Sequence, residues 1–471
     1  MSNWRPELSN LPGSRYGAIV QALQLSIQNG ELLPGQRLPT HRDLAAALGV
    51  SIQTVARAYT EAERQGLVKG EVGRGTFICY ARPQKHAISR ADTVSLHIIE
   101  TEEGQVFNFS TLIPVVGEMH HELIRRVFLE IGGTGDVNPF LAGQPIAGLQ
   151  RHREGAVQWL ARQGVTVSAD RVLVTNGVAQ ATWAAMASLA RSGDVLATAQ
   201  YVDSGVITNA SILNLRQIGL ELDEEGILPA SLEAACQSHR VKLLYMTPVY
   251  NIPTASLMSE GRCKQIAEIV HRYGLSVIED DAYGPLVPDR PRPFWTYAPD
   301  RTCYITSFSR IVPGLRTGYL VGPEGLMSRL ISRFRATSWM ANTWTAEVAT
   351  RWIESGTATE LVDWQRAAIH ERQEAAAEAL RGAEYVSHPY CQHLWLSLPG
   401  TWRARAFTRQ AAERGVLVTP PDPFLVGRVI EPHAVRISIG GTLQSAAVVR
   451  EGLSILNSLL AEGPDPIGMM Y

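Results

Sequence analysis

Short apolar runs alternate with helical stretches from about residue 106 to the end of the chain. This alternation is typical of an α/β architecture, because neighbouring parallel strands must be joined by a crossover that usually contains a helix. We therefore expect a large, mostly parallel sheet domain, with a small α/β subdomain over about residues 366–471. The runs that predict strands are 172–175, 194–198, 242–247, 276–279, 303–307, 317–321, 393–398, 416–419 and 434–439.

A separate unit of short helices precedes this region. A helix pattern spans residues 16–29. Thr40 can cap a second helix that ends at Gly49, and Ser51 can start a third. Two short strand patterns around a glycine-rich turn follow them. We expect an α+β domain over residues 1–80.

The composition is that of a globular protein, with 45% hydrophobic and 19% charged residues among 471. This length predicts about two to four domains. Residues 81–105 are polar and weakly periodic, so we predict a linker there. No run of about 18 apolar residues predicts a transmembrane helix, and the first residues lack the basic and apolar regions of a secretory signal. The expected location is the cytoplasm, without a membrane partner.

Charge is distributed unevenly along the chain. Residues 1–80 hold eight Lys/Arg and six Asp/Glu, whereas the whole chain has a net charge of −2. A positive module on a larger acidic body has the sign expected of a nucleic-acid-binding domain. The cysteines have neither metal-ligand nor disulfide spacing, and we predict reduced, buried thiols and no metal site at Cys79, Cys236, Cys263, Cys303 and Cys391.

Two short helices followed by a β-wing can place the last helix in the major groove of DNA. There Gln53 could pair with adenine, and Arg57 with guanine or phosphate, while Val55 and Tyr59 would turn into the core. For any single arginine, a solvated surface charge is an equally good interpretation. We predict DNA contacts from Arg37, Arg42, Ser51, Gln53, Thr54, Arg57, Arg74, Gly75 and Thr76.

The N-terminal unit resembles the GntR-type winged helix, a family of DNA-binding regulators. It has the P-x-x-R-x-L-A pattern from Pro39, the L-G-V-S turn at 48–51, the T-V-x-R-A-Y helix at 54–59 and the G-R-G-T-F wing at 73–77. These motifs occur in order and without a gap. The resemblance implies that the partner is a double-stranded DNA operator.

Residues 106–471 resemble a fold-type I aminotransferase, a class of enzyme that binds pyridoxal phosphate. A GntR-type winged helix fused to such a domain is the arrangement of the MocR subfamily. The resemblance implies that Asp280, in V-I-E-D-D-A-Y, would keep the pyridine nitrogen protonated and that Tyr283 would bond the ring oxygen. Tyr201 would stack on the ring, and Arg436 would clamp a substrate carboxylate.

The same resemblance implies a phosphate site. Residues 174–180, V-T-N-G-V-A-Q, are similar to the loop that cradles the phosphate at a helix N-terminus. Each candidate taken alone also has a structural interpretation, such as a helix cap for Asp280. The predicted cofactor or effector site comprises Val178, Ala179, Tyr201, Asn251, Asp280, Tyr283, Ser307, Ser309, Arg310, Arg316 and Arg436.

The chain departs from the aminotransferase pattern at the lysine motif. The family has S-F-S-K, and this chain has S-F-S-R, ending at Arg310. A Schiff base needs a neutral amine, whereas a guanidinium stays protonated because its pKa exceeds ~12. None of the four lysines matches the motif: Lys69, Lys85, Lys242 and Lys264. We therefore expect no catalytic residues, with pyridoxal phosphate bound non-covalently or no cofactor at all.

Two further positions differ. Ile252 replaces the asparagine that bonds the ring's phenolic oxygen, although the neighbouring Asn251 could partly substitute for it. Gly143 stands in the place of a tyrosine that reaches the phosphate of the partner subunit. Arg310 could pair with a phosphate or carboxylate in the cleft, or it could be an inert arginine.

The interpretation that we favour is a homodimeric transcription regulator. Its large domain would bind a small anionic effector without turnover, and the ligand would alter the spacing of the two DNA-reading units. The first alternative is a pyridoxal-phosphate-dependent aminotransferase that carries a DNA-binding domain, against which the missing lysine argues. The second is a scaffold protein that binds no ligand.

Overall fold

The computed structural model describes residues 4–6, 14–28, 31–32, 36–64, 67–71, 75–78, 106–133, 138–427, 430–441 and 445–464. The chain divides into two compact units, residues 1–92 and 93–471. Arg74, Cys79, Lys85 and the predicted linker 81–105 lie outside the described residues. No helix in the described ranges is long and apolar enough to cross a membrane.

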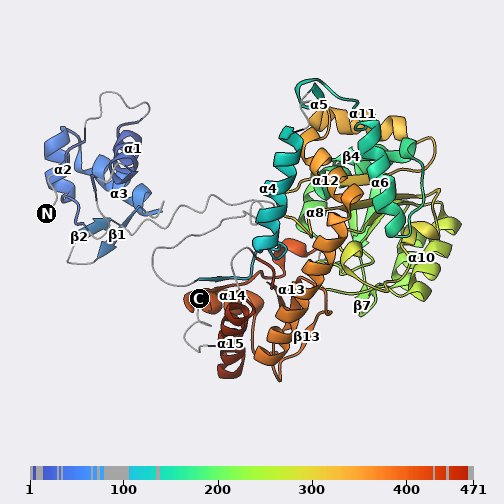
Figure 1. Ribbon diagram of the computed structural model, residues 1–471. Helices are drawn as coiled ribbons and strands as arrows, with labels where there is room; N and C mark the ends of the chain where they lie inside the picture. The colour runs from blue at the N-terminus through green and yellow to red at the C-terminus, as the bar shows by residue number, and fades with distance from the viewer. Residues whose placement is uncertain are drawn as a thin grey trace. The chain divides into compact units, whose positions relative to one another are not determined.

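The N-terminal unit contains three helices and a two-stranded wing (Figure 1, blue). Thr40 caps the second helix by accepting a hydrogen bond from the Asp43 backbone N–H, and Gly49 ends that helix at φ 61°. Ser51 Oγ accepts from the Thr54 N–H at the start of the third helix. These caps agree with the sequence pattern. The elements are α1 Arg15–Gln28, α2 His41–Leu48, α3 Ile52–Arg64, β1 Val68–Glu71 and β2 Gly75–Ile78.

The core of this unit fixes the orientation of α3. Val55 and Tyr59 are buried, as predicted, whereas Gln53 and Arg57 on the same helix are exposed. The Tyr59 hydroxyl donates to the Pro39 carbonyl over 2.9 Å. The burial of one face therefore leaves the other face of α3 in solvent.

A seven-stranded sheet forms the centre of the second unit, in the order β4-β12-β11-β10-β9-β5-β6. The prediction of a mostly parallel sheet is confirmed. The exception is β12, which runs antiparallel to both β4 and β11. Sequence reasoning missed the edge strand β6. The bounds are β4 Val172–Thr175, β5 Val195–Ala199, β6 Arg216–Leu220, β9 Val241–Met246, β10 Ser276–Asp280, β11 Thr302–Ser307 and β12 Gly318–Val321.

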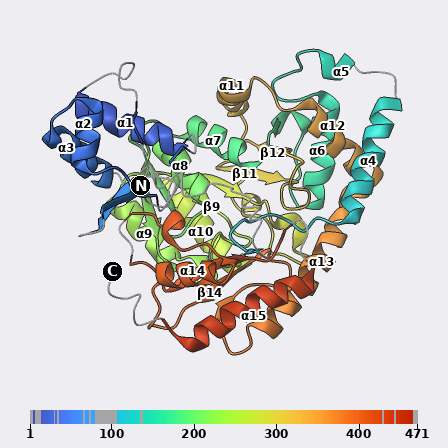
Figure 2. The ribbon, with the colours of Figure 1, turned by 90° about the vertical axis from the view of Figure 1, so that its left-hand side faces the viewer.

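Helices cover the sheet, and Figure 2 shows α4, α6 and α12 grouped along one side of this unit. A short hairpin of β7 Leu222–Asp223 and β8 Gly226–Ile227 follows β6. The helices are α4 Glu118–Gly133, α5 Asn138–Leu141, α6 Gln150–Arg162, α7 Val178–Leu189, α8 Ser204–Ile212, α9 Pro229–Ser238, α10 Glu260–Tyr273, α11 Met327–Ser338 and α12 Thr343–Ser355.

A second core lies in the C-terminal part of this unit. It is built on the sheet β13-β14-β16, and α13 packs against α15 beside it. Phe107 and Phe109 belong to this core, because β3 pairs in parallel with β15. The elements are β3 Phe107–Asn108, α13 Thr357–Ala379, β13 Tyr385–Val386, β14 His393–Ser397, α14 Ala404–Glu413, β15 Val416–Leu417, β16 Ala434–Ser438 and α15 Ala446–Glu462.

Candidate functional site

Asp280 ends β10 at the carboxyl edge of the sheet, where α/β proteins commonly bind ligands. Its Oδ2 accepts from the Tyr245 hydroxyl over 2.7 Å, and its Oδ1 accepts from the Ala282 N–H over 3.2 Å. Burial raises the pKa of Asp280 to about 6, against the opposing effects of these hydrogen bonds and of the Arg310 charge. This carboxyl therefore titrates near neutrality.

Arg310 follows β11 and approaches the same place. Its Cζ lies 4.7 Å from the centroid of the Tyr283 ring, and its Nη1 donates to the Leu112 carbonyl over 3.3 Å. Its backbone is held by Gln392, which donates to the Arg310 carbonyl over 2.8 Å. The Nε of Arg310 is buried and has no hydrogen-bond partner among the described residues. A buried donor in this condition favours an acceptor supplied from outside.

Arg436 lies in β16 and is also buried. Its Nη2 donates to the Ser110 carbonyl and, over 3.0 Å, to Thr419 Oγ1, so part of its donor set is already used. Its Nε is a second buried donor without a partner in the described part of the chain. Burial, with a smaller contribution from the Arg310 charge, lowers the pKa of Arg436 to about 10, and Asp203 and Tyr283 oppose this shift.

The residues predicted to hold a phosphate lie at the start of α7 and in the segment after β11. Gly177 precedes α7 with φ 93°, so the first-turn N–H groups belong to Val178 and Ala179. A Cβ on Gly177 would lie 3.1 Å from an Nη atom of Arg316, and glycine therefore permits that guanidinium to approach. The Ser307 and Ser309 hydroxyls lie 2.7 Å apart after β11.

The loop before α7 is anchored to the end of α11 and to the N-cap of α12. Asn176 donates to Ser338 Oγ over 2.7 Å, and its Oδ1 accepts from the Asn342 N–H over 2.8 Å. Asn342 caps α12 by accepting from the backbone N–H groups of Trp344 and Thr345. These contacts hold the cradle loop in one position relative to α12.

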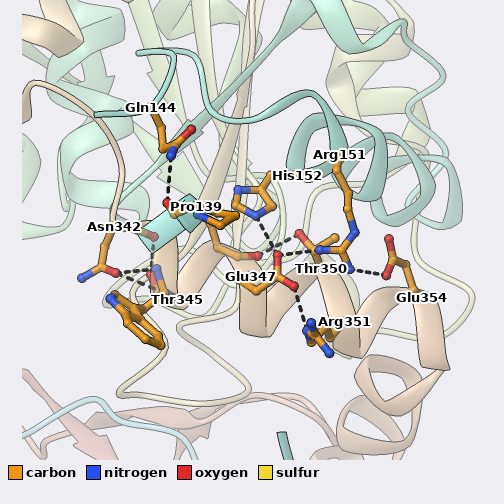
Figure 3. A network of polar contacts seen from close by, with 12 residues as sticks. Pro139, Gln144, Arg151, His152, Asn342, Thr345, Glu347, Thr350, Arg351 and Glu354 are labelled. Carbon is orange, nitrogen blue, oxygen red and sulfur yellow. Dashed lines mark hydrogen bonds and ion pairs between the residues drawn. The ribbon is translucent and has the colours of Figure 1, made fainter. Parts of the chain in front are cut away.

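An ion network centred on the buried Glu347 in turn fixes α12 to α6 (Figure 3). Glu347 on α12 accepts hydrogen bonds from Arg151 and His152 on α6 and from Arg351 on its own helix. Burial alone would raise the pKa of Glu347, but the three donors lower it to about 2. The carboxylate is therefore charged at neutral pH, and it supports the site indirectly through α12.

Other predicted residues are already engaged. The Asn251 amide nitrogen donates to the Tyr201 carbonyl over 3.3 Å and to Thr254 Oγ1 over 2.9 Å. The Tyr201 ring lies 6.5 Å, centroid to centroid, from Trp395. Ile252, the residue that departs from the family pattern, is buried in the core.

Sequence reasoning missed Tyr245 and His393. Tyr245 lies on the strand next to Asp280, but no motif marks it, and only the pairing of β9 with β10 predicts its place. His393 Nδ1 lies 3.5 Å from the Tyr283 hydroxyl. Burial, with Arg436 and Arg310 nearby, lowers the pKa of His393 to about 3, so the ring is neutral. No local signal in the sequence could have found it.

The lysines of the described residues lie elsewhere. Lys69, Lys242 and Lys264 are all exposed. Lys242 is near the start of β9, the end opposite to the edge that carries Asp280, and Lys264 is within α10. Arg310 is thus the basic side chain over Tyr283.

The predicted DNA readers lie on one unit. Arg42, Ser51, Gln53 and Arg57 are exposed, whereas Thr54 is half-buried. The Arg57 Cζ lies 4.4 Å from the centroid of the Tyr16 ring.

The wing residues lie close to one another. Arg37 packs so closely against Gly75 that a Cβ there would meet its Nε at 2.6 Å, and the Thr76 carbonyl accepts from the Leu38 N–H over 2.8 Å.

Two families match separate parts of the chain. Residues 15–78 match bacterial regulatory proteins of the gntR family, and residues 114–453 match the family of class I and II aminotransferases. The crystal structure of a kynurenine aminotransferase from Pyrococcus horikoshii covers 77% of this chain and 92% of its own, with a TM-score of 0.70 and 24% identity. At this identity the likeness shows the fold.

Two relatives are named as HTH-type transcriptional regulators. The HTH-type transcriptional regulator YdeF of Bacillus subtilis is 30% identical over 468 residues, which is 97% of each chain. The HTH-type pyridoxine biosynthesis transcriptional regulator PdxR of Corynebacterium glutamicum is 24% identical over 319 residues, which is 66% of this chain and 67% of its own. The chain therefore belongs to the MocR subfamily of GntR-type transcriptional regulators, in which a winged helix is joined to an aminotransferase domain.

Proposed function

We propose that this protein is a sequence-specific DNA-binding regulator whose aminotransferase-like domain binds a small anion without turning it over. Residues 1–80 would bind DNA, and residues 81–105 would form the linker to the second domain. Residues 106–471 would bind the effector and form the dimer. The subdomain from about residue 366 would carry Arg436 into the site. The observation that carries the proposal is the buried Nε of Arg310 beside Asp280 and Tyr283, which has no hydrogen-bond partner in the part of the chain that the structure describes.

Arg310 is suited to binding an anion and unsuited to covalent catalysis. Its guanidinium remains protonated and can donate two parallel hydrogen bonds to a carboxylate or phosphate. The second unpartnered donor, on Arg436, adds to the positive potential of the same site. We infer that Arg310 occupies the place that a Schiff-base lysine takes in the enzymes, and that turnover is absent for this reason.

Pyridoxal phosphate fits this arrangement as a non-covalent ligand. Asp280 would face the pyridine nitrogen, and the first turn of α7, the two serines after β11 and Arg316 would hold the phosphate. When bound, the cofactor supplies an electron sink. The residues of this chain would bind and orient it, and no amine of the described residues is available to attach it. Another phosphate- or carboxylate-bearing effector would use the same groups.

Regulation would follow from dimerisation. We propose a homodimer in which occupancy of the site changes the spacing of the two winged helices on double-stranded DNA. The exposed side chains of α3 and the neighbouring Arg37 and Arg42 would contact the operator. Tests of this step need both ligand and DNA.

The proposal is tested with the purified full chain. Duplexes are selected from a random DNA pool, and their affinity is measured by mobility shift at fixed salt, with and without pyridoxal phosphate. We expect a defined recognition sequence and no amino-group transfer from added amino acids. Binding without sequence preference would refute the regulator, and transfer by the pure chain would establish the alternative, an aminotransferase with a DNA-binding domain.

A further inference from the structure

A cavity of about 400 Å³ lies in the second unit, away from the Asp280 site. It is formed by the end of α6, the beginning of α13 and the loop over residues 284–293. None of the residues predicted for the cofactor or effector site lines it. Its volume is within the range of pockets that hold small organic molecules, roughly 300–1,000 Å³.

Internal contacts fix the walls of this cavity. Arg290 forms an ion pair with the fully buried Asp281 and also donates to the Gln163 carbonyl over 2.9 Å. Arg366 donates to the Leu286 and Pro285 carbonyls. The loop also contains prolines at four positions that line the cavity, which restricts its backbone: Pro285, Pro288, Pro291 and Pro293. The cavity is therefore formed before any ligand enters.

The lining carries uncompensated positive charge. Arg290 and Arg366 have carboxylate partners in Asp281 and Asp363. Two further arginines, Arg162 and Arg292, form no ion pair with a carboxylate of the described residues. The Nη1 of Arg162 donates to the Thr359 hydroxyl. Asp289 is the one other acidic residue in the lining. The balance favours a ligand with a negative group.

Apart from Gln163 and Thr359, the uncharged part of the lining is apolar or glycine. Trp159, Val287, Val362 and the proline rings offer surface for a hydrocarbon or aromatic body. The indole Nε1 of Trp159 is buried and lacks a hydrogen-bond partner among the described residues, so this wall also holds an unused donor. An apolar body with one carboxylate matches both parts of the lining.

Two contacts join the wall of the cavity to segments that carry residues of the Asp280 site. The Trp159 ring stacks on Phe308, with centroids 4.7 Å apart, and Phe308 is next to Ser309 in the Arg310 loop. Asp281, the partner of Arg290, directly follows Asp280. We propose that this cavity is a second ligand site, for a small organic carboxylate, distinct from the site in the proposed function.

The test is ligand-observed saturation-transfer NMR on the full chain with benzoate, phenylacetate and hexanoate. At least one probe binds, and R162Q combined with R292Q weakens that binding at least about tenfold, the loss expected for charge-assisted hydrogen bonds. T359W, which places an indole at an exposed position of the lining, also abolishes it. R216Q, on the exposed edge strand β6, leaves it unchanged.

Competition separates this site from the Asp280 site. Saturating pyridoxal phosphate does not displace the bound carboxylate, and this outcome is the same whether or not the regulator proposal holds. The second site is refuted if all three probes fail to bind, if the variants of Arg162, Arg292 and Thr359 bind as the wild type does, or if pyridoxal phosphate displaces the probe.

Discussion

Two arginine–tyrosine pairs, one in each unit, make the same contact in opposite surroundings. Arg57 lies over Tyr16 with its side chain exposed. Arg310 lies over the buried Tyr283, and its own buried Nε has no partner within the described ranges. Water can satisfy the donors of the first guanidinium and can be displaced by DNA. Water does not reach the buried Nε of Arg310, and a buried donor that stays unpaired costs free energy. The difference in burial therefore suits the exposed Arg57 to contacts with DNA and the buried Arg310 site to a bound anion.

The largest expected effect is at the buried pair. R310Q replaces the charged guanidinium with a neutral amide on a shorter side chain, and we expect it to weaken sulfate and pyridoxal phosphate binding by about 2–3 kcal/mol, the value of a charge-assisted hydrogen bond. Calorimetric titration measures this loss, with R216Q as the matched control on an exposed strand. Equal affinities of R310Q and the wild type would show that Arg310 binds no anion.

Changes at the exposed Arg57 and at the neighbouring Arg42 should cause a smaller loss of affinity, and only for DNA. R57A and R42A should each weaken operator affinity by about 1–3 kcal/mol in a mobility-shift assay at fixed salt. Neither change should alter sulfate binding, because both residues lie in the N-terminal unit. Unchanged operator affinity in both variants would mean that α2 and α3 do not read DNA in the way proposed.

Substitution of Tyr16, the residue under Arg57, tests how much the exposed cation–π contact contributes to DNA binding. Y16L removes the aromatic face and should weaken operator affinity by about 0.5–1 kcal/mol, the value of an exposed cation–π contact, whereas Y16F should bind as the wild type does. Circular dichroism of both variants checks that α1 is retained. A loss in Y16F as large as that in Y16L would assign the effect to the hydroxyl and not to the ring.

The smallest expected effect is a pH dependence. Because burial raises the pKa of Asp280 to about 6, its carboxyl is neutral below that pH and charged above it. The stability that this group contributes is therefore present at low pH and is lost as the pH rises through about 6. Sulfate, whose charge is constant over this range, should bind several-fold more weakly above pH 6 because the ionised carboxylate repels it.

D280N provides the control, since its amide does not titrate. Its sulfate affinity should be independent of pH between about 5 and 7. The same slope in D280N and in the wild type would assign the pH dependence to another group.

How far the sequence predicts this structure depends on burial. The sequence predicts strands at residues 172–175 and 317–321 almost to their ends, because every residue of β4 and β12 is buried and apolar, aromatic or small. The edge strand β6, R-Q-I-G-L, was missed because its residues are mainly exposed or half-buried and lack an apolar run. β3 was missed because two residues carry no periodicity.

The site could be predicted only where a local motif exists. Asp280 and Arg310 each stand in a recognisable run, whereas Tyr245 and His393 reach the site through contacts 35 and 110 residues apart in the chain. The engagement of Asn251 and Arg436 by backbone carbonyls also depends on the tertiary fold. Such contacts have no local signature because the chain must fold before they exist.

The most direct test of the central claim is the mass of the chain after borohydride reduction in excess pyridoxal phosphate. Reduction makes any imine between the cofactor and a protein amine permanent. We predict no specific mass increase for the wild type, and for R310K the addition of one reduced pyridoxyl phosphate group per chain. A stoichiometric addition to the wild-type chain, at any of its own lysines, would contradict the account.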